Sequence, residues 1–284
     1  MTEPLDIQRL RSWIGREESA SDTISPDLVR RFNATIGIEG NVPSLGDPAP
    51  LLINYCLAPP AVPTSLLAED GHPEKGDFLP PVPLPRRMWA ASSLAFFGVL
   101  RVGAQVERVS RVADVVAKEG RTGTLCFVTV EHKSSVGGSV AIEETQTIVY
   151  REASTAQEAL NRSRPEPAAL GSHNRQVAVS APFLFRYSAL TFNAHRIHYD
   201  RHYAVEVEHY PGLVIHAPLQ ATLLLNYAAE LTGKPPSRFV FRAVSPLFGD
   251  ESINLHAAEE DGKINLWTAR RDGPVAMSAE AAWA

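Results

Sequence analysis

The chain has 284 residues, of which 44% are hydrophobic and 21% charged, close to the average for globular proteins. This composition argues against disorder, collagen-like repeats and a coiled coil, and the length fits two ordinary domains or one large domain. A formal net charge of −5 gives no general electrostatic attraction for nucleic acid. Prolines outnumber glycines, 22 to 18, which indicates many chain breaks in a sequence that otherwise forms a core.

The cysteines and the N-terminal residues bear on the compartment. Cys56 and Cys126 are distant in sequence and lie in apolar surroundings, which argues against a disulfide framework or a paired-cysteine metal site. The first residues carry acids where a signal peptide has a basic region, and no apolar run approaches about 18 residues. We therefore expect a soluble, cytoplasmic protein with no membrane segment.

The first half of the chain begins with a helix signal. Ser25 is an N-cap candidate, Pro26 suits the first helical position, and apolar residues follow at helical spacing. A proline-rich passage runs from Pro43 to Pro85 and holds an apolar piece, residues 51–57, that fits a buried helix or a strand. A disordered linker is the alternative for the rest of the passage, but four apolar anchors favour an ordered, irregular cover over a sheet: Phe78, Leu79, Val82 and Leu84.

Strand-like runs then follow at 95–100, 104–109, 125–132 and 141–150. Glycines separate them at Gly103, between Gly120 and Gly123, and at Gly137 and Gly138, as in a multi-stranded antiparallel sheet. The polar stretch 152–175 is the best linker candidate. We therefore predict an N-terminal unit over 1–151, a linker over 152–175 and a C-terminal unit over 176–284.

The second half repeats the order of the first. A helix that is apolar nearly all round is predicted from about Pro218 to Leu231, and it ends at Gly233. Strand-like runs follow at 239–244, 252–257, 264–269 and 275–283. Each half thus reads as a helical or irregular part followed by four strands, which predicts an α+β protein made of two units, each a helix wrapped by an antiparallel sheet.

Histidines are concentrated in the second half, where five of the nine lie between positions 195 and 216. His195 and His198 flank a polar bend, which we place after a strand, and an imidazole can take a proton at physiological pH. Asn193 can fix a water beside them. Ordinary surface histidines are the alternative, above all for His202 and His209. A metal site is a further alternative, because His195, His198 and His202 would share one face of a helix.

The start of the second-half helix is a candidate oxyanion site. The N–H groups of a first helical turn lack partners and carry partial positive charge, so they stabilise an oxygen that becomes negative. Ala217 is placed for that contact. His216 either belongs to the site or only caps or packs against the helix.

These residues carry a resemblance. The run from Phe192 to Ala204 resembles the hydratase signature of the MaoC-like hot-dog family, and His216-Ala217-Pro218 resembles that family's His-Gly at the start of the central helix. The whole chain resembles its double hot-dog branch, which includes mesaconyl- and itaconyl-coenzyme A hydratases and type 2 hydroxyacyl-thioester dehydratases. The phrases that match are Phe192 to Asp200, Tyr210 to Val214, Trp13 to Arg16 and Leu84 to Trp89.

The sequence departs from the wider family at four positions. Asn193 stands where most hydratases have aspartate, His195 where they have asparagine, Arg196 where they have proline, and Ala217 where they have glycine. The resemblance therefore places the proton transfer on His198, with water held by Asn193. His195 binds the hydroxyl or acts as a second acid/base, and the Ala217 N–H keeps the oxyanion contact.

The implied activity is the addition of water to an enoyl-coenzyme A, or the reverse, in the C-terminal unit, with a degenerate N-terminal hot dog shaping the substrate tunnel. A short dicarboxylic acyl group such as mesaconyl or itaconyl is favoured. We expect no cofactor, no metal, no nucleic-acid or membrane partner, and a homodimer or larger homo-oligomer. A non-catalytic acyl-thioester binding protein and a histidine-metal hydrolase are the alternatives.

Coenzyme A is polyanionic, so a protein with a negative net charge needs a local basic patch to bind it. Arg196 ranks first among the basic candidates, because it lies between the two site histidines and could pair with a substrate carboxylate or, structurally, with Asp200. The other candidates are Arg86, Arg87, Arg201, Arg238 and Arg242.

Overall fold

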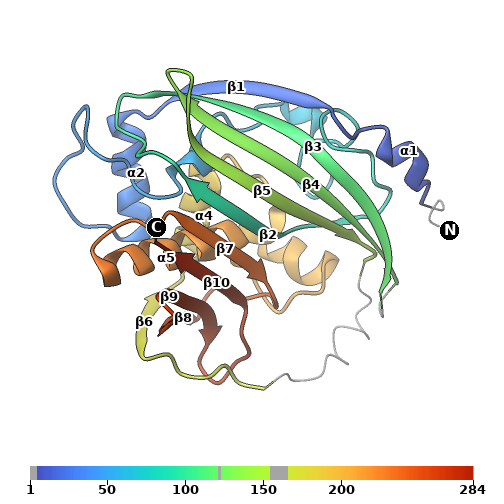
Figure 1. Ribbon diagram of the computed structural model, residues 1–284. Coiled ribbons are helices and arrows are strands. Elements are labelled where there is room, and N and C mark those ends of the chain that lie inside the picture. The colour runs from blue at the N-terminus through green and yellow to red at the C-terminus, as the bar shows by residue number, and fades with distance from the viewer. Residues whose placement is uncertain (1–4, 121–122, 154–165, 284) are drawn as a thin grey trace.

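A computed structural model of the chain describes residues 5–120, 123–153 and 166–283. All strands in the described residues belong to one antiparallel ten-stranded sheet, in the order β1-β3-β4-β5-β2-β7-β10-β9-β8-β6 (Figure 1). The predicted α+β class is confirmed. No helix in these three stretches is long and apolar enough to cross a membrane.

The first half of the sheet is built from the N-terminal part of the chain. Its strands, from the edge inward, are β1 (Glu17–Thr23), β3 (Gln105–Gly120), β4 (Gly123–Val136), β5 (Ser139–Arg151) and β2 (Arg86–Phe96). Two helices accompany them, α1 (Ile7–Arg11) and α2 (Pro26–Ile36). As predicted, Ser25 caps α2, because its side chain accepts a hydrogen bond from the Leu28 N–H at 3.1 Å.

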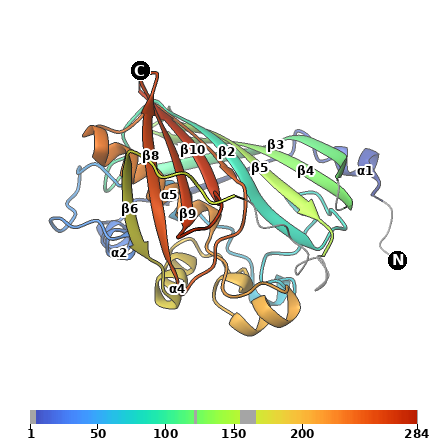
Figure 2. The ribbon, with the colours of Figure 1, turned by 90° about the horizontal axis from the view of Figure 1, so that it is seen from below.

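The second half of the sheet has the same internal order. From its edge inward it contains β6 (His173–Ala178), β8 (Ser252–Glu260), β9 (Lys263–Arg270), β10 (Met277–Ala282) and β7 (Arg238–Ala243). The second strand of each half, β2 and β7, pair at the centre, with Ser92 opposite Phe241. Both halves therefore place their five strands in the order first, third, fourth, fifth, second, and the predicted duplication is confirmed. Figure 2 shows the sheet passing without a break from one half to the other.

Helix α5 (Ala217–Thr232) occupies the concave side of the second half of the sheet and contacts β7 to β10 and also β2. It ends at Gly233, whose φ of 71° is left-handed, as the sequence predicts. Most of its side chains are buried, which agrees with its nearly uniform apolar character.

In the first half, helix α2 packs mainly against α4 (Ala181–Leu190). The proline-rich passage covers this half of the sheet. It forms two 3₁₀ turns, Ile53–Cys56 and Thr64–Leu66, and it buries Val82 and Leu84 against β3, β4 and β5. The predicted ordered, irregular cover is confirmed.

The turn between β4 and β5 needs its two glycines. Gly137 and Gly138 both have positive φ, 56° and 79°, as the two-residue turns that join twisted antiparallel strands require. The sequence predicts this turn correctly.

Several elements differ from the sequence prediction. Strands β1 and β6 were missed, because they are exposed edge strands without an apolar pattern and are held by main-chain pairing with β3 and β8. Strand β2 spans Arg86–Phe96 and not 95–100. Because β6 begins at His173, the predicted linker 152–175 includes the start of a strand; residues 154–165 of that linker lie outside the described residues.

Helix α4 was also missed. Its aromatic run has strand propensity, but Leu184, Tyr187 and Ser188 are buried at helical spacing. The bend that carries His195 and His198 therefore follows a helix, and its predicted position after a strand is wrong.

Candidate active site

A cavity of about 2110 Å³ opens between the two halves of the chain. Its walls come from the proline-rich passage, from β4 and β5, from the turn after α4 and from the start of α5. Five of its lining residues concern the chemistry: His72, Asn193, His195, His198 and Ala217. The structure thus brings four residues predicted from the sequence to one cavity: Asn193, His195, His198 and Ala217.

The turn after α4 has a defined local geometry. Phe192 has a φ of 52°, and the Asn193 side-chain Oδ1 accepts a hydrogen bond from the His195 N–H at 3.0 Å. A 3₁₀ turn, Arg196–His198, follows. Such a side-chain turn suits asparagine, and it fixes the directions of His195 and His198.

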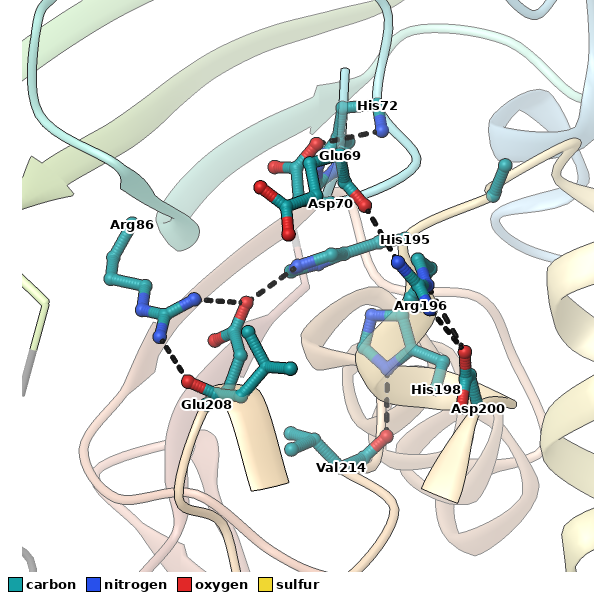
Figure 3. A network of polar contacts seen from close by, with 12 residues as sticks. Glu69, Asp70, His72, Arg86, His195, Arg196, His198, Asp200, Glu208 and Val214 are labelled. Carbon is teal, nitrogen blue, oxygen red and sulfur yellow. Dashed lines mark hydrogen bonds and ion pairs between the residues drawn. The ribbon is translucent and has the colours of Figure 1, made fainter. Parts of the chain in front are cut away.

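His198 is held as a neutral base. Its Nδ1 lies 2.7 Å from the Val214 carbonyl oxygen, which can only accept, so Nδ1 carries the proton and Nε2 keeps its lone pair (Figure 3). Burial, and then the neighbouring His216 and His195, hold the pKa of His198 well below its usual value. The residue is therefore ready to accept a proton without first losing one.

His216 supports His198 from behind. The two rings are stacked, with centroids 3.6 Å apart and planes 18° apart. His216 is fully buried, does not line the cavity, and its Nε2 lies 2.8 Å from the Ser188 hydroxyl. Burial lowers the pKa of His216 to about 3. His216 thus lies at the N-cap of the helix as a packing residue, which is one of the two roles that the sequence left open for it.

Ala217 is the first residue of α5 and lines the cavity. A first-turn N–H has no partner within its own helix and carries partial positive charge. The position therefore has the geometry for the predicted oxyanion contact.

His195 lies close to two other imidazoles and to a buried carboxylate. Its ring is 4.2 Å from the ring of His72 and 5.4 Å from that of His198, and its Nε2 lies 3.7 Å from Glu208 Oε1. Glu208 is buried and is paired in turn with Arg86 at 2.5 Å. Ion-pair contacts through Glu208 thus connect Arg86 of strand β2 to His195 in the turn after α4 (Figure 3).

Asp70, His72 and Glu208 were missed in the sequence. Asp70 accepts two bonds from His72, at 2.9 Å from its backbone N and at 2.9 Å from its Nδ1. Hydrogen bonds from His72 outweigh burial and keep the pKa of Asp70 below its usual value. The run Glu69-Asp70-Gly71-His72, an acid pair and a histidine around a glycine inside the proline-rich passage, was the signal that could have found this pair.

The predicted coenzyme A arginines are mostly engaged elsewhere. Arg196 pairs with Asp200 at 2.8 Å, which is the structural partner that the sequence offered, and Arg201 pairs with Asp250 at 3.3 Å. Neither lines the cavity, nor do Arg86, Arg238 and Arg242; only Arg87 of the six does. The expectation that Arg196 meets a substrate carboxylate is not supported by its position.

The histidine trio proposed for a metal is not assembled. His195 and His198 line the cavity, whereas His202 is exposed and does not. Among the described residues one other group has metal-type ligand atoms within 4.8 Å of one another: Asp70, His72 and His195. In that group the Asp70 carboxylate and the His72 Nδ1 already bond to each other.

Comparison with known proteins defines the class to which this fold and site belong. Residues 53–249 match the sequence profile of hydroxyacyl-thioester dehydratase type 2. The chain is 40% identical over 272 residues to mesaconyl-C(4)-CoA hydratase of Chloroflexus aurantiacus, covering 94% of this chain and 95% of the relative. The chain belongs to the type 2 hydroxyacyl-thioester dehydratase family and is, as the sequence predicts, a hydro-lyase.

Solved structures agree on the fold. HtdX of Mycobacterium tuberculosis superposes with a TM-score of 0.68 at 18% identity, covering 94% of this chain and 99% of that one. A second protein of the same organism, described as having a double hot-dog fold, gives a TM-score of 0.56 at 12% identity, covering 94% and 95%. The predicted double hot dog is confirmed.

Proposed function

We propose that the chain catalyses the reversible addition of water to the α,β double bond of an acyl-coenzyme A thioester. The proposal rests mainly on the His198 imidazole. This ring is buried, keeps the lone pair of Nε2, and lines a cavity that the start of α5 also lines. The identity with mesaconyl-C(4)-CoA hydratase over nearly the whole chain supports it.

The thioester carbonyl binds near the Ala217 N–H. As water adds to the β-carbon, the electron pair of the double bond moves towards the thioester and gives its oxygen enolate character. An N–H at a helix start stabilises that charge. Because Ala217 needs only its backbone for this contact, the change from glycine keeps the donor.

His198 performs the proton transfer. Its Nε2 takes one proton from a water that Asn193 orients, and the water oxygen bonds to the β-carbon. The same proton then passes from His198 to the α-carbon, which restores the neutral imidazole and balances the addition. His195, on the same wall, binds the new hydroxyl or acts as a second acid/base. The coenzyme A phosphates have Arg87 as a cation on the cavity wall.

The acyl group is a short dicarboxylic one, such as mesaconyl or itaconyl. The name of the 40% identical relative supports this choice, and the cavity wall on the first half of the sheet carries polar groups that a fatty acyl chain would not need: Arg108, His132, Glu144 and Gln146. These groups already have protein partners, since Arg108 donates to the Leu57 and Ala58 carbonyl oxygens and His132 bonds with Gln146, so they form a fixed polar wall to which a long fatty acyl chain offers no polar atom.

A panel of enoyl-coenzyme A thioesters, with and without a second carboxylate, tests the proposal through the loss of the conjugated thioester absorbance. We expect hydration of the dicarboxylic members with the highest kcat/KM. Tight binding without absorbance change would instead indicate a non-catalytic binding protein. Activity that is lost on chelation and restored by zinc would indicate the metal hydrolase. The homo-oligomeric assembly and the cytoplasmic location stay predictions.

A further inference from the structure

Asn193 cannot act as a base in the site. The amide oxygen of Asn193 is already held by the His195 N–H, and an amide takes up no proton near neutral pH. The Nε2 of His195 faces the Glu208 carboxylate at 3.7 Å. In the turn after α4, Asn193 can therefore still accept a hydrogen bond from water but cannot take up its proton, and His198 is the group there that can do both, unless another part of the chain supplies a second imidazole.

The loop of residues 69–72 is fixed against this turn. The Arg196 N–H donates to the Asp70 carbonyl oxygen at 2.9 Å, and the Arg196 Nη1 donates to the Glu69 carbonyl oxygen at 3.2 Å. Gly71 has a φ of 89°, and a Cβ at this position would lie 1.9 Å from the Ala194 carbonyl oxygen. Only glycine allows so close an approach, so the loop from the first half is seated on the turn from the second (Figure 3).

Asp70 sets the direction in which His72 accepts. The carboxylate can only accept from Nδ1, so Nδ1 of His72 carries the ring proton and Nε2 keeps its lone pair. No hydrogen-bond partner of this Nε2 is found in the described part of the chain. The side chain is 21% exposed and lines the cavity, so the exposed edge is available to a bound molecule.

His72 is neutral when the site is at rest. Burial, and then the charge of Arg87, lower the pKa of His72 to about 3, against the opposite effect of Asp70. His72 also acts on His198 electrostatically, since it is one of the groups that lower the pKa of His198. Both neutral imidazoles line the same cavity, and each keeps an Nε2 acceptor because its Nδ1 is engaged.

We propose that His72, oriented by Asp70, is a second catalytic histidine that holds the attacking water together with His198. This role rests on the proposed hydratase function. One water hydrogen passes to His198 Nε2 as the oxygen bonds to the β-carbon, and it is returned to the α-carbon. The other hydrogen stays on the oxygen, hydrogen-bonded to His72 Nε2, and becomes the product hydroxyl hydrogen. In dehydration His72 holds the same hydroxyl while His198 takes the α-proton and gives it to the leaving oxygen.

The test compares His72→Leu, His72→Gln and Asp70→Asn with the wild type on an enoyl-coenzyme A that the wild type hydrates. His72→Leu removes the acceptor, and we expect kcat to fall on the order of 10²-fold with KM within about threefold. His72→Gln keeps an acceptor oxygen and recovers part of that loss. His202→Gln, an exposed histidine outside the cavity, is the matched control and keeps the wild-type rate.

Asp70→Asn supplies a readout that a structural role would not move. The amide donates to Nδ1 and shifts the ring proton to Nε2, so kcat falls although the side chain keeps its size. Nitrogen-15 NMR of labelled histidine should show His72 protonated on Nδ1 in the wild type and on Nε2 in the variant.

The role of His72 and the hydratase function are overturned by different results. A folded His72→Leu variant at the wild-type rate, beside an inactive His198→Ala, would overturn the role of His72 and leave the hydratase function standing. A wild type that hydrates no enoyl thioester would overturn both. Thermal melting of each variant shows whether a lost activity reflects lost folding.

Discussion

The imidazole of His198 lies stacked on that of His216, 3.6 Å between centroids, with His198 on the cavity wall and His216 behind it. The hydrogen bond between His216 and Ser188 fixes the His216 ring, and this ring in turn supports His198. His198 is thus the ring that faces the cavity, and His216 is the buried ring that holds it in place.

His216→Ala should lower kcat about tenfold and destabilise the fold by about 2–3 kcal/mol, because it removes a buried ring and frees the His198 side chain. Steady-state kinetics and chemical denaturation measure both effects. Ser188→Ala removes only the hydrogen bond to the ring and should cost about 1 kcal/mol. An unchanged kcat in a folded His216→Ala variant would show that His198 needs no support from this ring.

Gly71→Ala should lower activity strongly, because the added methyl group meets the Ala194 carbonyl oxygen and pushes the loop of His72 away from the turn. Gly76→Ala is the matched control in the same passage. Gly76 also has a positive φ, 112°, but its Cβ would meet only Pro81 at 3.5 Å. Both variants carry backbone strain of about 1–2 kcal/mol, so an equal loss of activity in both would contradict the contact between the loop and the turn.

Glu208→Gln should destabilise the chain by about 3 kcal/mol, because it leaves the guanidinium of Arg86 without its buried partner. The control is the exposed Glu206, which lies in the short helix Tyr203–Val207 that ends just before Glu208, and Glu206→Gln should change stability by less than about 0.5 kcal/mol. Urea unfolding of the three proteins gives the comparison. Equal stabilities would show that the Arg86–Glu208 pair contributes nothing.

Acid should destabilise the fold below about pH 6.5. His72, His198 and His216 all have folded pKa values below the usual value, so the unfolded chain binds more protons as the pH falls. Their contribution is fully present above pH 6.5 and is lost towards the folded values, about 3 for His72 and His216.

Glu144 acts in the opposite direction over part of this range. Burial raises its pKa to about 7, so its contribution is present at low pH and is lost as the pH rises through 7. His132 and His256 also have lowered pKa values and Glu18 a raised one, so five histidines against two carboxyls still give a stability that falls with acid, by about 1.4 kcal/mol per pH unit for each group that responds fully. Denaturation midpoints from pH 7.5 to 4.5 that stay constant would contradict the neutral, buried histidines.

The sequence predicted the parts of the fold that rest on burial and turn chemistry. Helix α5 has a buried apolar surface and ends at a glycine. The glycine pair at 137 and 138 is typical of a tight turn between two strands. The edge strands β1 and β6 gave no such signal, because main-chain pairing holds them and their side chains face solvent. Helix α4 was hidden by a strand-like aromatic run that tertiary packing overrides.

The candidate site divides in the same way. His195, His198, Asn193 and Ala217 are close in sequence, so their meeting in one cavity could be predicted from a single stretch and its resemblance. Asp70 and His72 are more than a hundred positions away and meet His195 only through the folded loop. The ion pairs of Arg196 and Arg201 depend equally on their folded neighbours, and no charge count predicts them.

The rate of His198→Ala on an enoyl-coenzyme A that the wild type hydrates tests the central claim most directly. We predict a folded variant with kcat lower by about 10²–10⁴-fold, the usual size of a general acid–base contribution, and with little change in thioester binding. A folded His198→Ala variant that hydrates the same thioester at the wild-type rate would contradict the assignment of His198 as the base.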